Sequence, residues 1–244
     1  MQVEEITIDT AVKADMEWQD TLLMPVGDVQ LGSGATDVDR FKRHMEWGMK
    51  HQAYFLGMGD YVDVASPSNR TALRSARLYD SVHDKLEQAA AQDVTDFLDL
   101  VKGTEGRWLG LLQGHHFYEF FDGSTSDVRI AQALKAPFLG TCAFVRLRFQ
   151  RPGSNSTMTC TVWCHHGQGG GMKAAAPLNK LENLVPYFDA DIYLIGHMSK
   201  APAAVLDQLY LPRTGRPIVR HKSKVLAGTG GFMQGYRQAH KVGG

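Results

Sequence analysis

Five apolar runs of this chain end in the same way, and no other feature of the sequence restricts the fold as strongly. Each run is short and strand-like, and each stops at a motif that combines glycine with aspartate or histidine. A strand that ends in this way places its last side chain at the carboxyl edge of a sheet, where open α/β sheets collect their ligand groups. In chain order, the side chains at the five ends are Asp28, Asp60, His115–His116, His165–His166 and His197.

The repetition of this ending carries more weight than any single instance. A lone Gly-Asp after a strand is most often a turn, and a lone histidine is most often a packed or solvated residue. Aspartate and histidine are, however, the side chains that bind hard and borderline divalent metals. If the five strands align, their ends meet at one rim, so the sequence predicts a metal site assembled from the whole fold.

The segments between these runs predict alternating strands and helices in the first half of the chain. Val38, Phe41 and Met45 follow Asp37 at helical spacing, and aspartate is favourable at the start of a helix. Apolar residues three or four apart indicate that helix also dominates 70–101. The further elements expected are a short helix at 127–134, strands at 143–150 and 158–166 joined by a turn at 151–156, a helix around 178–185, strands at 205–211 and 218–226, and an edge strand or loosely packed arm in 1–20.

This order of elements predicts a single domain over residues 1–244. A chain of 244 residues can bury a substantial core, and its sequence contains no internal repeat or low-complexity linker. Strands alternate with helices early and form hairpins later. The pattern therefore favours an α/β protein with layers around a mixed sheet or two packed sheets.

Charge, hydropathy and cysteine content restrict the partners and the compartment. The formal net charge is zero, so no global field attracts the chain to nucleic acid or to an anionic membrane, and any basic surface must be local. No apolar run approaches the roughly 20 residues that span a bilayer. The three cysteines form no CxxC pair and fit strand positions, which is typical of a reducing compartment. We expect a cytoplasmic protein with no membrane partner.

The order of the five motifs resembles the signature of the calcineurin-like metallophosphoesterases, which reads GDxH, GDxxD, GNH, H and GHxH. The matches extend from Gly27 to His197, and Gly59–Asp63 matches the second motif completely. The resemblance implies a four-layer sandwich of two mixed β-sheets flanked by helices. It also implies two divalent metal ions at the strand ends, with Mn²⁺ the first expectation and Mg²⁺, Zn²⁺ or Fe as alternatives.

The resemblance assigns a role to each matching residue. Asp28 and Gln30 would bind the first metal, and Asp60 would bridge both metals. His116 falls on the catalytic histidine, which would protonate the leaving oxygen while a metal-activated hydroxide attacks phosphorus, and Asp63 would orient it. The residues that fall on metal-ligand positions are Asp28, Gln30, Asp60, His115, His166 and His197.

Three positions depart from the family pattern. Gln30 and Ser199 stand where the pattern has histidine, and His115 stands where it has asparagine. An amide oxygen is a weaker donor than imidazole for transition metals. The first metal should therefore bind more weakly than the second, which gains an imidazole.

Several assignments keep an alternative. His165 and His166 compete for one ligand role; the ligand precedes glycine in the family, which favours His166 and leaves His165 as a neighbour that faces the substrate or supports the ligands. His115 and His116 could likewise exchange roles. Gly167 and Gly169 belong to a glycine-rich loop whose backbone could approach a phosphate, or which could be a flexible connection.

The expected function is that of a metal-dependent phosphoesterase. A phosphodiesterase or nuclease that acts on DNA, RNA or nucleotides is the leading interpretation. Local basic clusters that include Arg146, Arg148 and Arg216 could line a nucleic-acid groove, or could be solvated strand faces. The alternative function is a degenerate family member that binds metal or a phosphate ligand as a non-catalytic interaction module.

Overall fold

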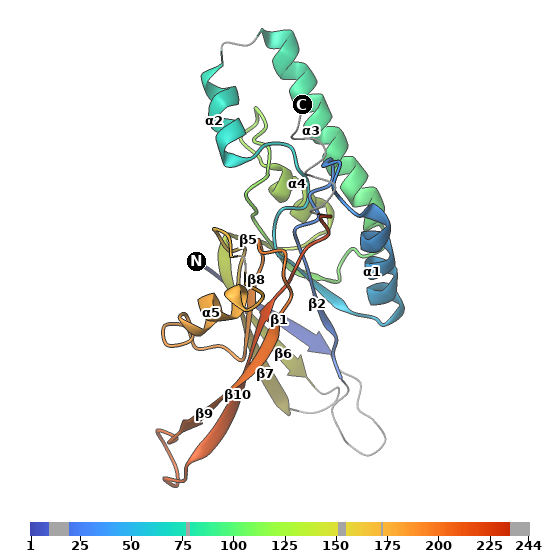
Figure 1. The fold of residues 1–244 in the computed structure, drawn as a ribbon. Coiled ribbons are helices and arrows are strands. Elements are labelled where there is room, and N and C mark those ends of the chain that lie inside the picture. Colours follow the sequence, from blue (N-terminus) through green and yellow to red (C-terminus); the bar gives the residue numbers. More distant parts are fainter. Residues whose placement is uncertain (10–19, 77–78, 151–154, 172, 235–244) are drawn as a thin grey trace.

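The computed structural model describes residues 1–9, 20–76, 79–150, 155–171 and 173–234, and within them the chain is an α/β protein with two β-sheets (Figure 1). The strand order is β1-β6-β7-β8-β10-β9 in the six-stranded sheet and β2-β3-β4-β5 in the four-stranded sheet. The strands are β1 (Gln2–Asp9), β2 (Leu23–Val26), β3 (Tyr54–Gly57), β4 (Trp108–Leu112), β5 (Phe138–Gly140), β6 (Cys142–Gln150), β7 (Thr157–His165), β8 (Ile192–Ile195), β9 (Ala203–Tyr210) and β10 (Arg220–Gly228). The helices are α1 (Val38–Lys50), α2 (Pro67–Ser75), α3 (Asp80–Leu100), α4 (Ser126–Ala133) and α5 (Ala176–Glu182).

The four-stranded sheet is parallel throughout, so the expectation of two mixed sheets is wrong for this one. Each of its strands is connected to the next by a segment that contains a helix: α1, then α2 and α3, then α4. Such crossovers return the chain to the same end of the sheet and make the neighbouring strands parallel. The six-stranded sheet is mixed, because β6 and β7 form an antiparallel hairpin and β9 pairs antiparallel with β10.

Three apolar clusters show how the layers pack. Helices α1, α3 and α4 cover the outer face of the four-stranded sheet, where Phe41 and Phe97 pack with Phe55 of β3. The next residue along β3, Leu56, points to the opposite face and packs between the two sheets. Helix α5 covers the outer face of the six-stranded sheet, where Leu181 belongs to the same cluster as Trp163. The layers thus follow the order helices, sheet, sheet, helix.

Local sequence explains where most elements begin and end. The Asp37 side chain accepts a hydrogen bond from the Arg40 N–H (3.1 Å) and caps α1, as the sequence predicts. The helical region predicted over 70–101 consists of two helices, since the backbone at Ala76 is extended after α2. Strand β5 is only three residues long and was not predicted.

The N-terminal and hairpin predictions are confirmed only in the described residues. Strand β1 is an edge strand that pairs in parallel with β6, whereas 10–19 lie outside the described residues. The predicted turn at 151–156 also lies largely outside them, because 151–154 are not described. The three cysteines are free and lie on β6 and β7. Among the helices that the structure describes, none combines the length and the apolar character needed to cross a membrane.

Replacement of Phe97 by alanine should destabilise the protein strongly. Phe97 is fully buried, and its ring lies 5.9 Å from Phe41 and 5.5 Å from Tyr61, so truncation leaves a cavity beneath α3. Urea unfolding should show a loss of about 3–5 kcal/mol. Phe121→Ala is the matched control, since Phe121 is 66% exposed and its loss should change stability by less than about 0.5 kcal/mol. Equal losses for the two variants would contradict the packing described here.

Candidate metal centre

The predicted strand ends meet at one place, where the two sheets face each other. The site residues that directly follow β2, β3 and β4 lie at the edge of the four-stranded sheet. Those that directly follow β7 and β8 lie at the edge of the six-stranded sheet. The loops after β2 and β3 are joined by the Asp28 N–H to the Gly59 carbonyl and by the Gln30 N–H to the Asp60 carbonyl (both 2.9 Å). The His197 N–H donates to Asp28 Oδ2 (2.8 Å) and connects β8 to the first loop.

Four of the residues at this junction have a left-handed backbone although they are not glycine. They are Asp28 (φ 50°), Gln30 (φ 49°), Asp60 (φ 54°) and His197 (φ 61°). This conformation costs of order 1–3 kcal/mol for a residue with a Cβ and clusters at functional sites. It turns the chain sharply after β2, β3 and β8 and leaves the polar side chains at the sheet edge.

Glycines allow the strand-end loops to approach one another closely. A Cβ on Gly114 would lie 2.1 Å from both the backbone nitrogen and Oδ1 of Asp60. A Cβ on Gly59 would lie 2.5 Å from Nδ1 of His166. Neither position has room for a side chain, so glycine is required at both. This explains why the motifs carry glycine beside the ligand residues.

Asp60, His115, His166 and His197 form a compact group of potential metal ligands. One donor atom from each of them lies within 4.8 Å of all the others. Two donors on opposite sides of a cation are separated by up to about 4.6 Å, twice the usual distance from donor to metal. The group is thus close to the size that one divalent cation requires.

Two buried atoms in this group lack a hydrogen-bond partner among the described residues. His166 Nδ1 lies 2.6 Å from the Met58 carbonyl, so Nδ1 carries a proton, and Nε2 presents a lone pair when the ring is neutral. Asp60 Oδ1 accepts hydrogen bonds from the His115 and His116 N–H groups, which leaves Oδ2 free. The free atoms, His166 Nε2 and Asp60 Oδ2, are 3.4 Å apart. Unpaired buried polar atoms are costly, and a cation would satisfy both, so these residues fit a metal.

The electrostatics of the group also suit a cation. Burial raises the pKa of Asp60, but the close approach and the charge of His166 outweigh it and hold the pKa well below the usual carboxyl range. Burial lowers the pKa of His115 to about 4 and also lowers the pKa of His197, so both imidazoles are neutral, the form that binds metals. Burial lowers the pKa of His166, but its contacts with Asp60 prevail and raise it.

A polar cleft of about 250 Å³ lies next to this group and contains the residues expected at the first metal. Asp28 is buried there, and burial is the main reason that its pKa rises to about 7. A cation beside Asp28 would favour its charged form. The cleft is lined by Asp28, Gln30, His116, His197, Ser199 and Met233, among others.

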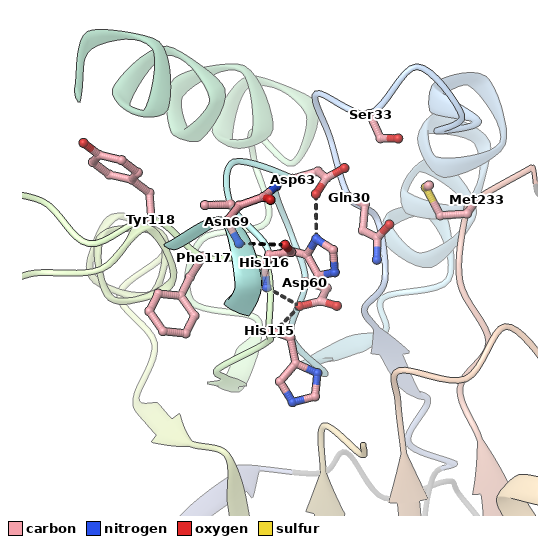
Figure 2. Close-up of polar contacts among 12 residues, drawn as sticks. Gln30, Ser33, Asp60, Asp63, Asn69, His115, His116, Phe117, Tyr118 and Met233 are labelled. Carbon is pink, nitrogen blue, oxygen red and sulfur yellow. Dashed lines mark hydrogen bonds and ion pairs between the residues drawn. The ribbon is translucent and has the colours of Figure 1, made fainter. Parts of the chain in front are cut away.

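His116 lies at this cleft but outside the four-residue group. Its Nδ1 is 2.6 Å from Asp63 Oδ1, and Figure 2 shows the ring directed at the Asp63 carboxylate. The hydrogen bond with Asp63 is the largest influence on His116 and raises its pKa. His116 is therefore held in one orientation and favours its protonated form, whereas the neighbouring His115 points into the ligand group.

His165 does not join the ligand group. Its ring stacks on Trp163, with 5.9 Å between the ring centres, and its Nδ1 accepts the Gly167 N–H (2.8 Å). Consecutive residues of a strand point to opposite faces of the sheet, so His165 and His166 face different sides. Of the two histidines, only His166 reaches the ligand group.

Two supporting residues were not found by sequence reasoning. Buried Asp127 accepts the Gly114 N–H (2.8 Å), and burial raises its pKa to about 6. Arg70 donates to the carbonyls of His115 (2.6 Å) and Phe117 (3.1 Å). Both side chains hold the main chain around His115, and no motif in the sequence signals such contacts. Gly231, which follows β10, also lines the cleft.

The remaining histidines lie outside this site where the structure describes them. His44 packs edge-on against Phe232 (5.4 Å between ring centres), and His51 stacks on Trp47 (4.3 Å). His83 contacts Phe121, His221 pairs with Asp207 (2.8 Å), and His240 is outside the described residues.

Comparison of the chain with protein-family models, curated proteins and solved structures finds no match. The resemblance to the calcineurin-like metallophosphoesterases therefore rests on the motifs alone. The inference of a function rests on these motifs and on the geometry of the site.

Replacement of His197 by alanine should remove one ligand and weaken metal binding. Loss of a residue that supports a ligand already reduces metal affinity by about 10–100-fold, so loss of a ligand should exceed this range. Titration of metal-free protein with Mn²⁺ or Zn²⁺ in a calorimeter measures the affinity, and circular dichroism establishes that the variant is folded. His51→Ala is the matched control, because His51 is exposed and its ring packs on Trp47 of α1, outside the ligand group. Equal affinity of the His197→Ala and His51→Ala proteins would exclude the proposed ligand group.

Proposed function

We propose that this protein is a metal-dependent phosphoesterase, with phosphodiesters as its substrates. The observation that carries the proposal is the placement of two parts in adjoining positions: a metal-sized group around Asp60 and a histidine oriented by a carboxylate, His116 with Asp63. A protein that binds metal without catalysing a reaction needs only the metal-sized group around Asp60. The pairing of both parts is what hydrolysis of a phosphate ester requires.

The same features support a calcineurin-like fold. The two facing sheets are flanked by helices, and the five motifs stand at the strand ends in the order of the family signature. The all-parallel four-stranded sheet differs from the sheet that the resemblance implies. The proposal of this fold is therefore carried by the layers and the site, while the strand directions of the smaller sheet are particular to this chain.

The proposed centre holds two divalent cations. His115, His166 and His197 would bind one of them, Asp28 and Gln30 would bind the other, and Asp60 would be shared. Bound cations would offset the negative charge of the phosphate and make a water molecule nucleophilic at neutral pH. The oxygen-rich side formed by Asp28 and Gln30 suits a harder ion such as Mn²⁺ or Mg²⁺, and the imidazole-rich side suits Zn²⁺, Mn²⁺ or Fe.

In this proposal His116 acts as the general acid. Asp63 holds Nδ1, which leaves Nε2 to donate a proton to the oxygen that leaves phosphorus. The raised pKa of His116 keeps this proton available near neutral pH. The His116 carbonyl accepts the Val64 N–H (3.3 Å), which further fixes the segment.

The basic clusters give little support to a long nucleic-acid groove. Lys224 is buried and donates to Asp189 (3.1 Å), and Lys222 pairs with Asp191 (3.1 Å). Arg146 lies 3.4 Å from Glu5. These cations are already paired with carboxylates, so the proposal of a nucleotide-type phosphodiester does not depend on a basic surface.

A non-catalytic binding module is the second candidate. The observation that favours it is the presence of Gln30 and Ser199 in the cleft, where the family has imidazoles. A weak first site could bind metal or phosphate without turnover. Binding of metal and phosphate with no hydrolysis of any phosphate ester would select this candidate.

Replacement of His116 by alanine should separate chemistry from metal binding. Both cations should remain, because no ligand is lost, while hydrolysis of a phosphodiester with a poor, high-pKa leaving group should fall by about 10²–10⁴. An ester with a good leaving group needs little protonation and should be affected far less. Measurement of kcat for both esters, together with metal content, tests this asymmetry.

Two further variants serve as controls for the role of His116. Asp63→Asn should show a milder form of the same asymmetry, because it only loosens the orientation of the His116 ring. His115→Ala should instead remove metal and reduce turnover of both esters. If His116→Ala strips the metal and His115→Ala spares it, the two histidines have exchanged roles and the assignment is wrong.

Replacement of Gln30 by histidine should strengthen the weaker metal site. Calorimetric titration of the unaltered metal-free protein should show one tight and one weak site, since the first site has an amide in place of an imidazole. The Gln30→His protein should bind the second equivalent of metal more tightly, with the tight site unchanged. Two equally tight sites in the unaltered protein would contradict this prediction.

A further inference from the structure

A second cavity, of about 480 Å³, lies on the opposite face of β7 and β8 from the ligand group. It is bounded by side chains of the six-stranded sheet and by the segment that contains and follows α5. Its volume lies within the roughly 300–1,000 Å³ range of small-molecule sites. Nothing in the proposed chemistry uses this cavity.

Flat aromatic rings form one wall of the cavity. The rings of Trp163 and Phe188 are stacked, with 4.9 Å between their centres and 18° between their planes. The His165 ring is nearly parallel to Trp163, at 11°. Leu184 and Ile195 add aliphatic contacts. Trp163 is only 2% exposed, so an occupant would contact the half-buried rings of Phe188 and His165. Aromatic rings of this kind favour a planar partner.

The rim of the cavity offers polar groups for orientation. Asn183 and Gln168 are exposed at the rim, and an amide side chain can donate and accept hydrogen bonds at the same time. The Trp163 indole N–H is buried in the wall with no hydrogen-bond partner among the described residues. The Lys180 ammonium, also at the rim, is directed to the Gln168 carbonyl. The occupant must therefore be largely apolar, with a few edge atoms that pair with amides.

The cavity and the ligand group are separated by very little chain. His165 lines the cavity and the next residue, His166, belongs to the ligand group, and consecutive Cα atoms are 3.8 Å apart. The chain then enters the glycine-rich loop, where a Cβ on Gly170 would contact nothing within 4 Å. A Cβ on Gly169 would meet only the Lys180 Nζ, at 3.7 Å. The loop between the two sites is therefore exposed and uncrowded at Gly169 and Gly170.

We propose that this cavity binds the nucleobase of the substrate, a nucleotide-type phosphodiester whose phosphate lies at the ligand group. The position of the phosphate rests on the proposed function, but recognition of the base does not. A nucleobase has the required chemistry: a flat, weakly polar ring that stacks on aromatic side chains, with donors and acceptors along its edge. An aliphatic chain would not use the amides, and a charged group would lose its hydration against the aromatic wall.

Binding of free nucleosides to metal-free protein tests this assignment without any hydrolysis. Adenosine and uridine should bind in a calorimetric or NMR titration, whereas ribose and ribose 5-phosphate should not. Asn183→Ala should weaken nucleoside binding by about 3–10-fold, the usual effect of a lost hydrogen bond. Asn179→Ala is the matched control, because Asn179 is exposed in α5, one turn before Asn183, and does not line the cavity. The nucleoside affinity of this variant should be unchanged.

A second variant blocks the cavity directly. Leu184→Trp places a large ring in the space and should abolish nucleoside binding, while calorimetric titration should show unchanged Mn²⁺ binding at the ligand group. Equal binding of ribose and adenosine, or equal affinities of the two asparagine variants, would overturn the proposal. Nucleoside binding without hydrolysis of any phosphodiester would leave the cavity assignment intact and defeat the proposed function. Hydrolysis of nucleotide diesters by a protein that does not bind nucleosides would support the proposed function and overturn the cavity assignment.

Discussion

The Asp60 carboxylate is the group on which the rest of the site depends. One of its oxygens is fixed by the backbone N–H groups of His115 and His116, and the other faces His166 across 3.4 Å. It therefore joins the ends of β3 and β4 in one sheet to the end of β7 in the other. Because Asp60 is fully buried, its charge is sustained only while compensating groups surround it.

The local cost of this arrangement is visible in the backbone. Asp28, Gln30, Asp60 and His197 hold left-handed conformations at about 1–3 kcal/mol each. Among the described residues, two buried atoms of the ligand group, Asp60 Oδ2 and His166 Nε2, also lack hydrogen-bond partners. Neither feature helps the chain to fold, and the apolar clusters on both sides of the four-stranded sheet must offset them. Strain and unpaired polar atoms at a single place are typical of a site kept for binding or chemistry.

The end of β7 shows how one strand can serve two sites. His166 turns toward Asp60, and His165 turns toward Trp163 and the aromatic cavity. The alternation of side chains along a strand makes this division automatic for adjacent residues. In the loop that follows, Gly169 and Gly170 are exposed. In our proposal, a single ligand crosses this loop and contacts the two faces of the sheet edge.

The sequence by itself determined the strand ends, the capped helix after Asp37 and the α/β class, because these follow from local spacing and side-chain chemistry. It also selected the residues that meet at the ligand group. Only the tertiary structure decided which of His165 and His166 enters that group, and it alone revealed the contacts of Arg70 and Asp127 with the main chain. The direction of a side chain at a strand end depends on the register of that strand against its neighbours. A contact between a side chain and a distant carbonyl or N–H leaves no periodic pattern in the sequence, so only the folded chain can show it.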